Sequence, residues 1–155
     1  MAQEIERKFL LANEDWRASV ESSARLQQGY LSGGSKATVR VRIYDDNEAV
    51  LTLKGKTNGI TRAEFEYPIP LEDARELMEM AKPHIVEKRR FKVPFENHLW
   101  EIDVFEGQHT GLVLAEVEMQ SADEHVVLPS WVGLEVSLDD RYANASLSRR
   151  AGIPE

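Results

Sequence analysis

The sequence of 155 residues contains no cysteine. This excludes disulfide scaffolds, thiolate zinc sites and cysteine nucleophiles, so any metal would be held by oxygen or imidazole. The sequence also lacks an apolar run long enough to cross a bilayer, and its N-terminus is acidic without a hydrophobic signal core. We therefore expect a protein that stays in the cytoplasm and has no membrane partner.

Basic residues are outnumbered by acidic ones, 19 Lys and Arg against 27 Asp and Glu, which gives a formal net charge of -8. Duplex binding usually needs a broad basic surface, so we expect no nucleic-acid partner. A local basic cavity stays compatible with this balance, since net charge says little about one concave site. The length and the 42% hydrophobic content predict one domain spanning residues 1–155.

Alternation of polar and apolar residues predicts that strands dominate. The predicted strands are residues 2–11, 25–31, 37–44, 48–56, 60–69, 84–93, 98–106 and 112–120, with an extended piece near 132–138. Eight or nine short strands are typical of a closed or nearly closed barrel. Turn residues at 45–48 and 57–59 predict hairpins, and therefore antiparallel neighbours.

Helical patterns are fewer. Asn13 can cap a segment in which Trp16 and Val20 are spaced four apart, and residues 71–81 carry one apolar stripe. A last short helix is predicted from Asp139 or Asp140 through Leu147. Both of the first two helices are expected to cover apolar outer faces of strands.

Several strands carry charge on one face only. In the first strand Glu4, Glu6 and Lys8 share a face, opposite Ile5 and Phe9. The same spacing recurs in Arg40-x-Arg42, Lys54, Lys88-x-Arg90 and Glu116-x-Glu118. Periodicity leaves open whether these faces meet water or a cavity, but solvated faces usually mix signs, whereas these are sorted by sign. Converging faces would suit a polyphosphate anion and hard divalent cations.

Taken together, these residues resemble the CYTH superfamily, also called triphosphate tunnel metalloenzymes. Further matching stretches are WEIDVFEG at 100–107, Ala115-Glu116-Val117-Glu118, Trp131-x-Gly133-x-Glu135-Val136 and Tyr142-x-Asn144. The resemblance covers nearly the whole chain. It implies a mainly β (α+β) fold, namely a closed eight-stranded antiparallel β-barrel tunnel with a charged interior and a few covering helices.

The resemblance also implies an enzyme, a metal-dependent triphosphatase that uses Mg²⁺ or Mn²⁺. The expected substrate is a small-molecule triphosphate, most often inorganic tripolyphosphate, which water would split into pyrophosphate and phosphate. The expected phosphate-binding cations are Arg40, Arg42, Lys54, Lys88 and Arg90, with Arg62 as a weaker candidate. The expected metal-facing carboxylates are Glu4, Glu6, Glu116 and Glu118, with Asp103 as a helper. Lys8, Glu4 and Glu6 are the expected catalytic residues, and Lys8 would orient the water or contact a phosphate.

Two alternatives stay open. An adenylate cyclase of the same superfamily carries the same motifs, and a non-catalytic polyphosphate-binding module would need the cations alone. Four tunnel glutamates weigh against the second alternative, because acids repel an anion unless metal offsets them.

A homodimer is one way to cover the part of an apolar barrel exterior that two helices leave open. Glu66 is assigned to the surface and Tyr30 to the core or rim, and residues 29–36 do not fit a phosphate loop.

Overall fold

The computed structural model describes residues 2–33 and 36–155. Its strands are β1 (Gln3–Leu11), β2 (Ser22–Gly33), β3 (Thr38–Tyr44), β4 (Glu48–Lys54), β5 (Thr61–Ile69), β6 (Ile85–Phe95), β7 (His98–Phe105), β8 (Val113–Glu118) and β9 (Val132–Glu135). Each coincides with a predicted strand, apart from shifts at the ends. Gly34 and Ser35, which belong to the segment rejected as a phosphate loop, lie outside the described residues.

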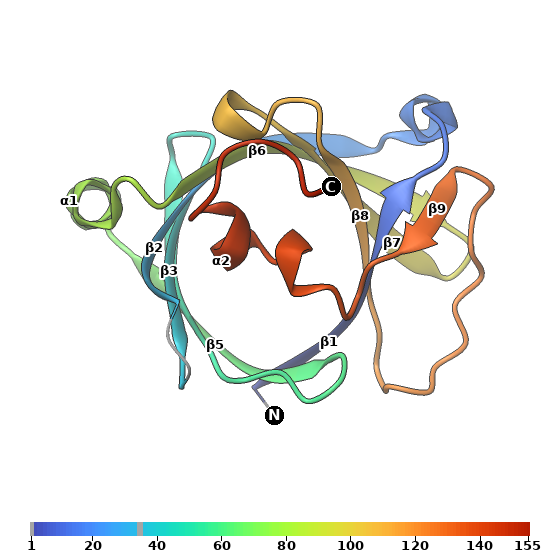
Figure 1. The fold of residues 1–155 in the computed structure, drawn as a ribbon, viewed down its shortest axis with the longest axis horizontal. Helices are drawn as coiled ribbons and strands as arrows, with labels where there is room; N and C mark the ends of the chain where they lie inside the picture. The colour runs from blue at the N-terminus through green and yellow to red at the C-terminus, as the bar shows by residue number, and fades with distance from the viewer. Residues whose placement is uncertain (1, 34–35) are drawn as a thin grey trace.

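Eight of the described strands close into an antiparallel barrel. The strand order is β5-β4-β3-β2-β6-β7-β8-β1, and pairing of β1 with β5 completes the ring (Figure 1). β9 is the additional strand and pairs with the far end of β1. The predicted closed barrel is therefore confirmed.

Short turns set the register of the hairpins. Asp45 and Asp46 both have positive φ, at 52° and 54°, which is the geometry of a type I′ turn between β3 and β4. Asn58 and Thr61 form an isolated bridge around Gly59, whose φ is 65°. Both predicted turn regions are confirmed.

The helical elements only partly match the sequence pattern. α1 (Leu71–Ala81) has the predicted bounds, and the predicted last helix is divided into η3 (Asp140–Tyr142) and α2 (Asn144–Leu147). The segment after Asn13 is a 3-10 helix, η1 (Asp15–Ser19), instead of a longer amphipathic helix. β2 begins at Ser22, earlier than predicted, and leaves no room for further turns. A second short 3-10 helix, η2 (Gly107–His109), links β7 to β8.

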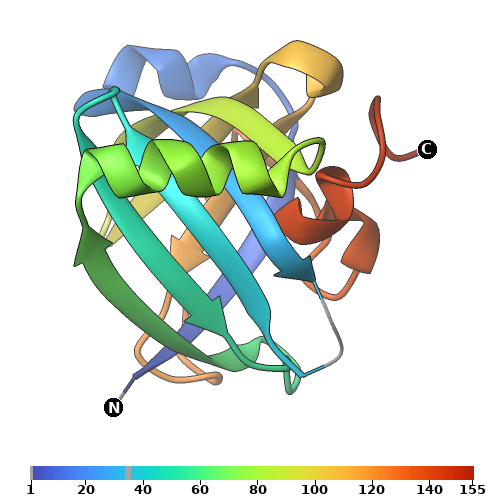
Figure 2. The same cartoon turned by 90° about the vertical axis from the view of Figure 1, so that its left-hand side faces the viewer.

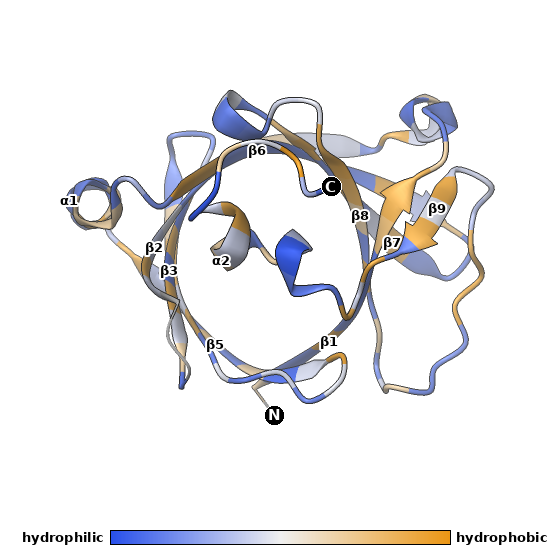
Figure 3. Ribbon diagram, viewed as in Figure 1, coloured by the Kyte–Doolittle hydropathy of each residue, from blue (hydrophilic) through white to orange (hydrophobic). Residues whose placement is uncertain are grey.

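Much of the apolar core lies outside the barrel wall. One cluster covers β1, β6, β7 and β8 and includes Phe9, Trp16, Trp100 and Trp131, while another places Ala74 of α1 against β3 and β4. Figure 2 shows α1 lying across the strands, and Figure 3 shows hydrophobic residues along β9 and the adjoining end of β1. The barrel interior is thereby left for polar side chains.

A third cluster closes one end of the barrel. Tyr142 and Leu147, from η3 and α2, pack against residues of β2, β6 and β8 that include Tyr30, Val86 and Leu114. Figures 1 and 2 show this C-terminal segment crossing one end of the ring of strands. We call residues 139–148 the C-terminal cap. Across residues 2–33 and 36–155, no helix combines the length and apolar character needed to span a membrane.

Candidate active site

The barrel encloses a charged cavity of about 250 Å³. Side chains from all eight barrel strands and from the C-terminal cap line it. They include Glu4, Glu6, Lys8, Tyr30, Arg40, Arg42, Lys54, Arg62, Glu64, Glu66, Lys88, Arg90, Glu101, Glu116, Glu118 and Asn144. The alternation of each strand points these residues inward because the apolar residues between them are needed outside. The converging arrangement that the family resemblance implied is therefore observed.

Arginines of β3 form one side of the cavity. The Nε–H of Arg42 donates to Oε1 of Gln28 at 2.8 Å, and the Arg42 side chain also donates to the Tyr44 hydroxyl. Burial and the neighbouring Arg40 and Arg90 lower the pKa of Arg42. Among the described residues, the Nε–H of Arg40 is buried without a hydrogen-bond partner. The close approach of several cations and the unpaired Nε–H of Arg40 both favour binding of an anion here.

Lys88 and Arg90 of β6 share one buried carboxylate. Asp103 is fully buried, lies 2.6 Å from the Lys88 ammonium and accepts two hydrogen bonds from Arg90 at 2.8 and 2.9 Å. Burial alone would raise the pKa of Asp103, but these two cations hold it well below its usual range. Burial, reinforced by Arg90 and opposed by Asp103, lowers the pKa of Lys88 to about 7.

The opposite side of the cavity gathers acidic side chains. Glu6 on β1 and Glu118 on β8 are direct cross-strand partners. Burial, together with Glu116 and Glu4, raises the pKa of Glu6 to about 8. Burial and neighbouring carboxylates, first among them Glu4, likewise raise the pKa of Glu118. Like charges placed directly opposite each other destabilise a sheet, so this side favours a bound cation.

Lysines connect the two sides of the cavity. Lys54 donates to Glu4 at 2.8 Å, and Lys8 lies 3.7 Å from Glu116 and donates to the backbone carbonyl of Tyr142. Burial opposes ionisation of Glu116, but Lys8 and Arg90 outweigh it and lower the pKa of Glu116 to about 2. Glu116 is therefore ionised at neutral pH, at the boundary between the basic and acidic sides.

The carboxylate oxygens of the acidic side suit a divalent metal ion whose coordination shell is completed by oxygens of the substrate. Within the described residues, no three acidic or histidine side chains form a ready-made metal cage. Mg²⁺ in phosphate-handling sites is commonly held by one or two carboxylates, water and phosphate oxygens. The opposed Glu6 and Glu118 can serve in that way, because a cation between them would offset their repulsion.

The structure brings nearly all of the predicted site residues to this cavity. Asp103 is the exception, since it lies behind the lining with both oxygens on Arg90 and Lys88. Arg62 lines the cavity but also donates to the backbone carbonyl of Gly55. The assignment of Glu66 to the surface is incomplete: its side chain is 45% exposed, yet its carboxylate accepts a hydrogen bond from Thr52 at the cavity mouth.

Further polar contributors lie outside the set of expected site residues. Glu101 lies opposite Glu116 and 3.3 Å from Arg90. Gln28 and Asn144 are carboxamides that hold Arg42 and Lys88 respectively. The inward alternation of β7 could have identified Glu101, whereas the two carboxamides carry no charge that would mark them.

Comparison with known proteins agrees with this architecture. Residues 2–150 match the model of the CYTH domain. The chain belongs to the CYTH family. An inorganic triphosphatase from Acetivibrio thermocellus is 38% identical over 148 residues, which cover 95% of this chain and 94% of that protein. An inorganic triphosphatase from Nitrosomonas europaea is 35% identical over 150 residues, covering 94% and 96%.

A solved structure agrees with this fold as well. The crystal structure of an inorganic triphosphatase superposes with a TM-score of 0.69 at 34% identity, and the match covers 98% of this chain and 100% of that one. The likeness spans the barrel and the C-terminal cap together. The CYTH family resemblance inferred from Glu4-x-Glu6-x-Lys8 and the later motifs is therefore confirmed.

Proposed function

We propose that this protein hydrolyses inorganic tripolyphosphate to pyrophosphate and phosphate. The observation that carries the proposal is the barrel cavity in which buried cations face paired carboxylates. Its volume of about 250 Å³ accommodates a compact inorganic phosphate chain. The two triphosphatase relatives support the same substrate.

The basic side would bind the phosphate chain. Arg40 and Arg42 present planar guanidinium groups that suit paired phosphate oxygens, and Lys88 and Arg90 extend the positive surface along β6. Lys54 and Arg62 lie nearer the acidic side and would contact the other end of the chain. Phosphoryl transfer depends mainly on such positioned charge, because little covalent chemistry is asked of the protein.

The acidic side would hold Mg²⁺ or Mn²⁺ through Glu4, Glu6, Glu116 and Glu118. When bound, a divalent ion would polarise the scissile phosphate and lower the pKa of a water. Lys8 would orient the attacking water or contact a phosphate, because its ammonium lies beside Glu116 at the boundary. Asp103 would act through Lys88 and Arg90 instead of through the metal, since its oxygens are already bonded to them.

Adenylate cyclisation is the second candidate, because the same charged groups would serve attack by a ribose hydroxyl. One panel separates the candidates: tripolyphosphate, pyrophosphate, ATP and thiamine triphosphate, each with Mg²⁺ or Mn²⁺, with free phosphate and cyclic AMP measured. We expect metal-dependent phosphate release, fastest from tripolyphosphate. Cyclic AMP as the main product from ATP would favour the cyclase. Tight binding with no turnover would favour a polyphosphate-binding module, and equal rates with and without chelator would remove the metal role.

Four finer expectations belong to the same proposal. They are a single domain over residues 1–155, Mg²⁺ or Mn²⁺ as the ion, a cytoplasmic location and a homodimer. The homodimer is supported by Phe65 and Tyr67 on the outer face of β5, which are 45% and 54% exposed. Large exposed aromatic side chains on a barrel wall are a common feature of protein interfaces.

A further inference from the structure

The C-terminal cap contributes a side chain to the cavity wall. Asn144 begins α2, and its Oδ1 accepts a hydrogen bond from the Lys88 ammonium at 2.9 Å. The same oxygen lies 3.5 Å from Nε2 of Gln28. Lys88 is 1% exposed, and its other close oxygen belongs to Asp103. Asn144 and Asp103 therefore hold this ammonium from two directions.

The carboxamides connect the two principal cationic strands. Gln28 is fully buried on β2, accepts from Arg42 through Oε1 and donates to the Tyr30 hydroxyl through Nε2. A continuous set of contacts thus runs from Arg42 through Gln28 and Asn144 to Lys88. Neutral carboxamides orient these cations without neutralising them, whereas a carboxylate in their place would cancel charge needed for phosphate.

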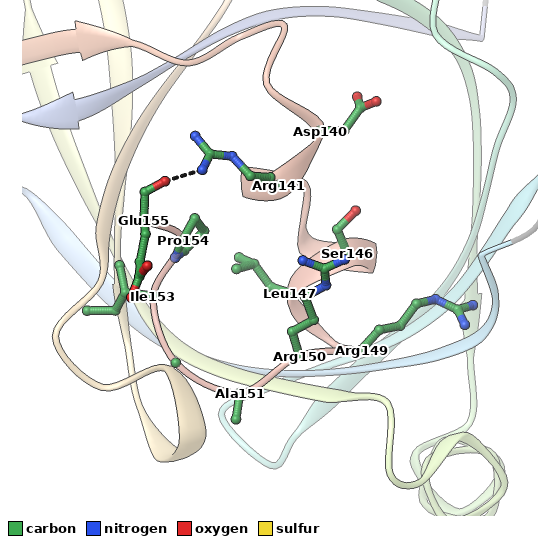
Figure 4. A pocket seen from close by; sticks show the side chains of 11 residues that line it. Asp140, Arg141, Ser146, Leu147, Arg149, Arg150, Ala151, Ile153, Pro154 and Glu155 are labelled. Carbon is green, nitrogen blue, oxygen red and sulfur yellow. Dashed lines mark hydrogen bonds between the residues drawn. The ribbon is translucent and has the colours of Figure 1, made fainter.

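The position of Asn144 is fixed by its neighbours in the cap. Tyr142 and Leu147 are buried on either side of it in the apolar cluster. The backbone carbonyl of Tyr142 accepts from Lys8, and Nε2 of His109 lies 2.6 Å from the carbonyl of Leu147. The other side of the cap faces outward, where Ser146 of the cap and Arg149, which follows it, line a separate pocket (Figure 4).

We propose that Asn144 is a positioning residue that fixes the Lys88 ammonium for the phosphate chain, which makes the C-terminal cap part of the substrate site. The inference rests on the proposed function for its substrate. Its structural basis is the partly buried Lys88–Asn144 hydrogen bond, whose acceptor comes from a segment more than fifty positions away along the chain. Loss of the acceptor would leave Lys88 drawn to Asp103 alone, away from the cavity.

A double-mutant cycle on tripolyphosphate binding tests this role. Asn144→Leu should weaken binding about tenfold by calorimetry without metal, because a hydrogen bond to a charged group is lost. In a Lys88→Met background the same change should alter binding by less than about threefold. Asn144→Asp keeps an acceptor and should retain kcat within about threefold while raising KM, whereas Asn144→Leu should lower kcat about tenfold. Ser146→Ala, on the outer side of the same helix, should match wild type.

The outcomes distinguish the positioning role of Asn144 from the proposed hydrolysis of tripolyphosphate. If Asn144→Leu lowers tripolyphosphate affinity equally in the wild-type and Lys88→Met backgrounds, its effect is purely structural and the inference is overturned. Asn144→Ala serves the same comparison if the leucine variant fails to fold. Tight binding with the expected coupling but no turnover would retain the positioning role and reject triphosphate hydrolysis. Turnover by wild type together with additive effects of the two substitutions would retain triphosphate hydrolysis and reject the positioning role. Absence of tripolyphosphate binding by wild type would reject both proposals.

Discussion

Glu116 and Arg42 lie in the same cavity but should influence different steps. We expect Glu116→Gln to lower kcat by about a hundredfold, because it weakens charge stabilisation that develops in the transition state. Arg42→Ala should also raise KM, since it removes a phosphate contact present before the transition state. Steady-state kinetics with tripolyphosphate and saturating metal distinguish the two profiles. Glu48→Gln, at the exposed first residue of β4, is the matched control. Wild-type kinetics in both cavity variants would show that these side chains do not serve the reaction.

Asp103 should matter most for stability. Asp103→Asn leaves Lys88 and Arg90 without their buried carboxylate, and breaking a buried ion pair costs about 3–5 kcal/mol. We expect the Tm at pH 7 to fall by more than about 5 °C, while the exposed-loop control Asp123→Asn leaves it nearly unchanged.

The Tm difference between wild type and Asp103→Asn should depend on pH, because the pKa of Asp103 is depressed in the folded state. Its contribution is complete above the unfolded pKa of about 3.9 and is lost progressively as the pH falls below that value. The Tm gap between wild type and Asp103→Asn should therefore narrow between pH 5 and pH 2 (roughly the range in which an unfolded carboxyl takes up its proton). A gap that stays constant over this range would contradict an ionised Asp103.

At the scale of elements, α1 approaches the barrel closely at one glycine. A Cβ on Gly29 of β2 would lie 2.7 Å from Cβ of Ala81 and 2.8 Å from Sδ of Met78. Gly29→Ala should therefore push α1 outward and cost about 1–3 kcal/mol, seen as a lower Tm. Gly55→Ala is the control, because its added Cβ would make only an ordinary contact of 3.4 Å with Ala63. Equal Tm values for the two variants would contradict this packing.

The strands and the sign-sorted faces could be predicted from sequence because strand alternation has a fixed period of two residues. The inward direction of those faces could not be predicted, since a strand whose charged face meets solvent shows the same alternation. It follows from barrel closure between β1 and β5, which pairs Glu4 with Arg62 across distant parts of the chain. The length of the helix after Asn13 was overestimated, because the spacing of Trp16 and Val20 does not reveal how early β2 begins.

The least predictable site residues are those whose role depends on contacts between separate elements of the fold. Gln28 and Asn144 acquire their roles only when β2, β6 and the C-terminal cap meet. The sequence marked Asn144 only through the family resemblance, and Gln28 carried no signal. Asp103 was placed in the right neighbourhood, but its bonding to two cations depends on the register of β6 against β7.

At the scale of the whole molecule, the exposed aromatic side chains of β5 allow a test of the predicted homodimer. If β5 forms the interface, Phe65→Glu should shift the protein to a monomer in light scattering, because a buried unpaired charge is costly at an interface. Met80→Glu, at a 72% exposed position on α1, should not change the mass. A monomeric wild type, or a Phe65→Glu dimer of unchanged affinity, would contradict this interface.

The central claim is that the barrel charges converge on one cavity that binds a linear triphosphate. The most direct test is the Tm in tripolyphosphate and in sulfate at matched ionic strength, without metal. Binding to the folded state at a hundredfold excess over Kd stabilises by about 2.7 kcal/mol, which raises the Tm by about 5 °C or more. We expect tripolyphosphate to exceed sulfate by that margin, and Arg40→Ala combined with Lys88→Ala to abolish the difference. Equal Tm shifts for the two anions in wild type would contradict the cavity, because a solvated charged face would only be screened by salt.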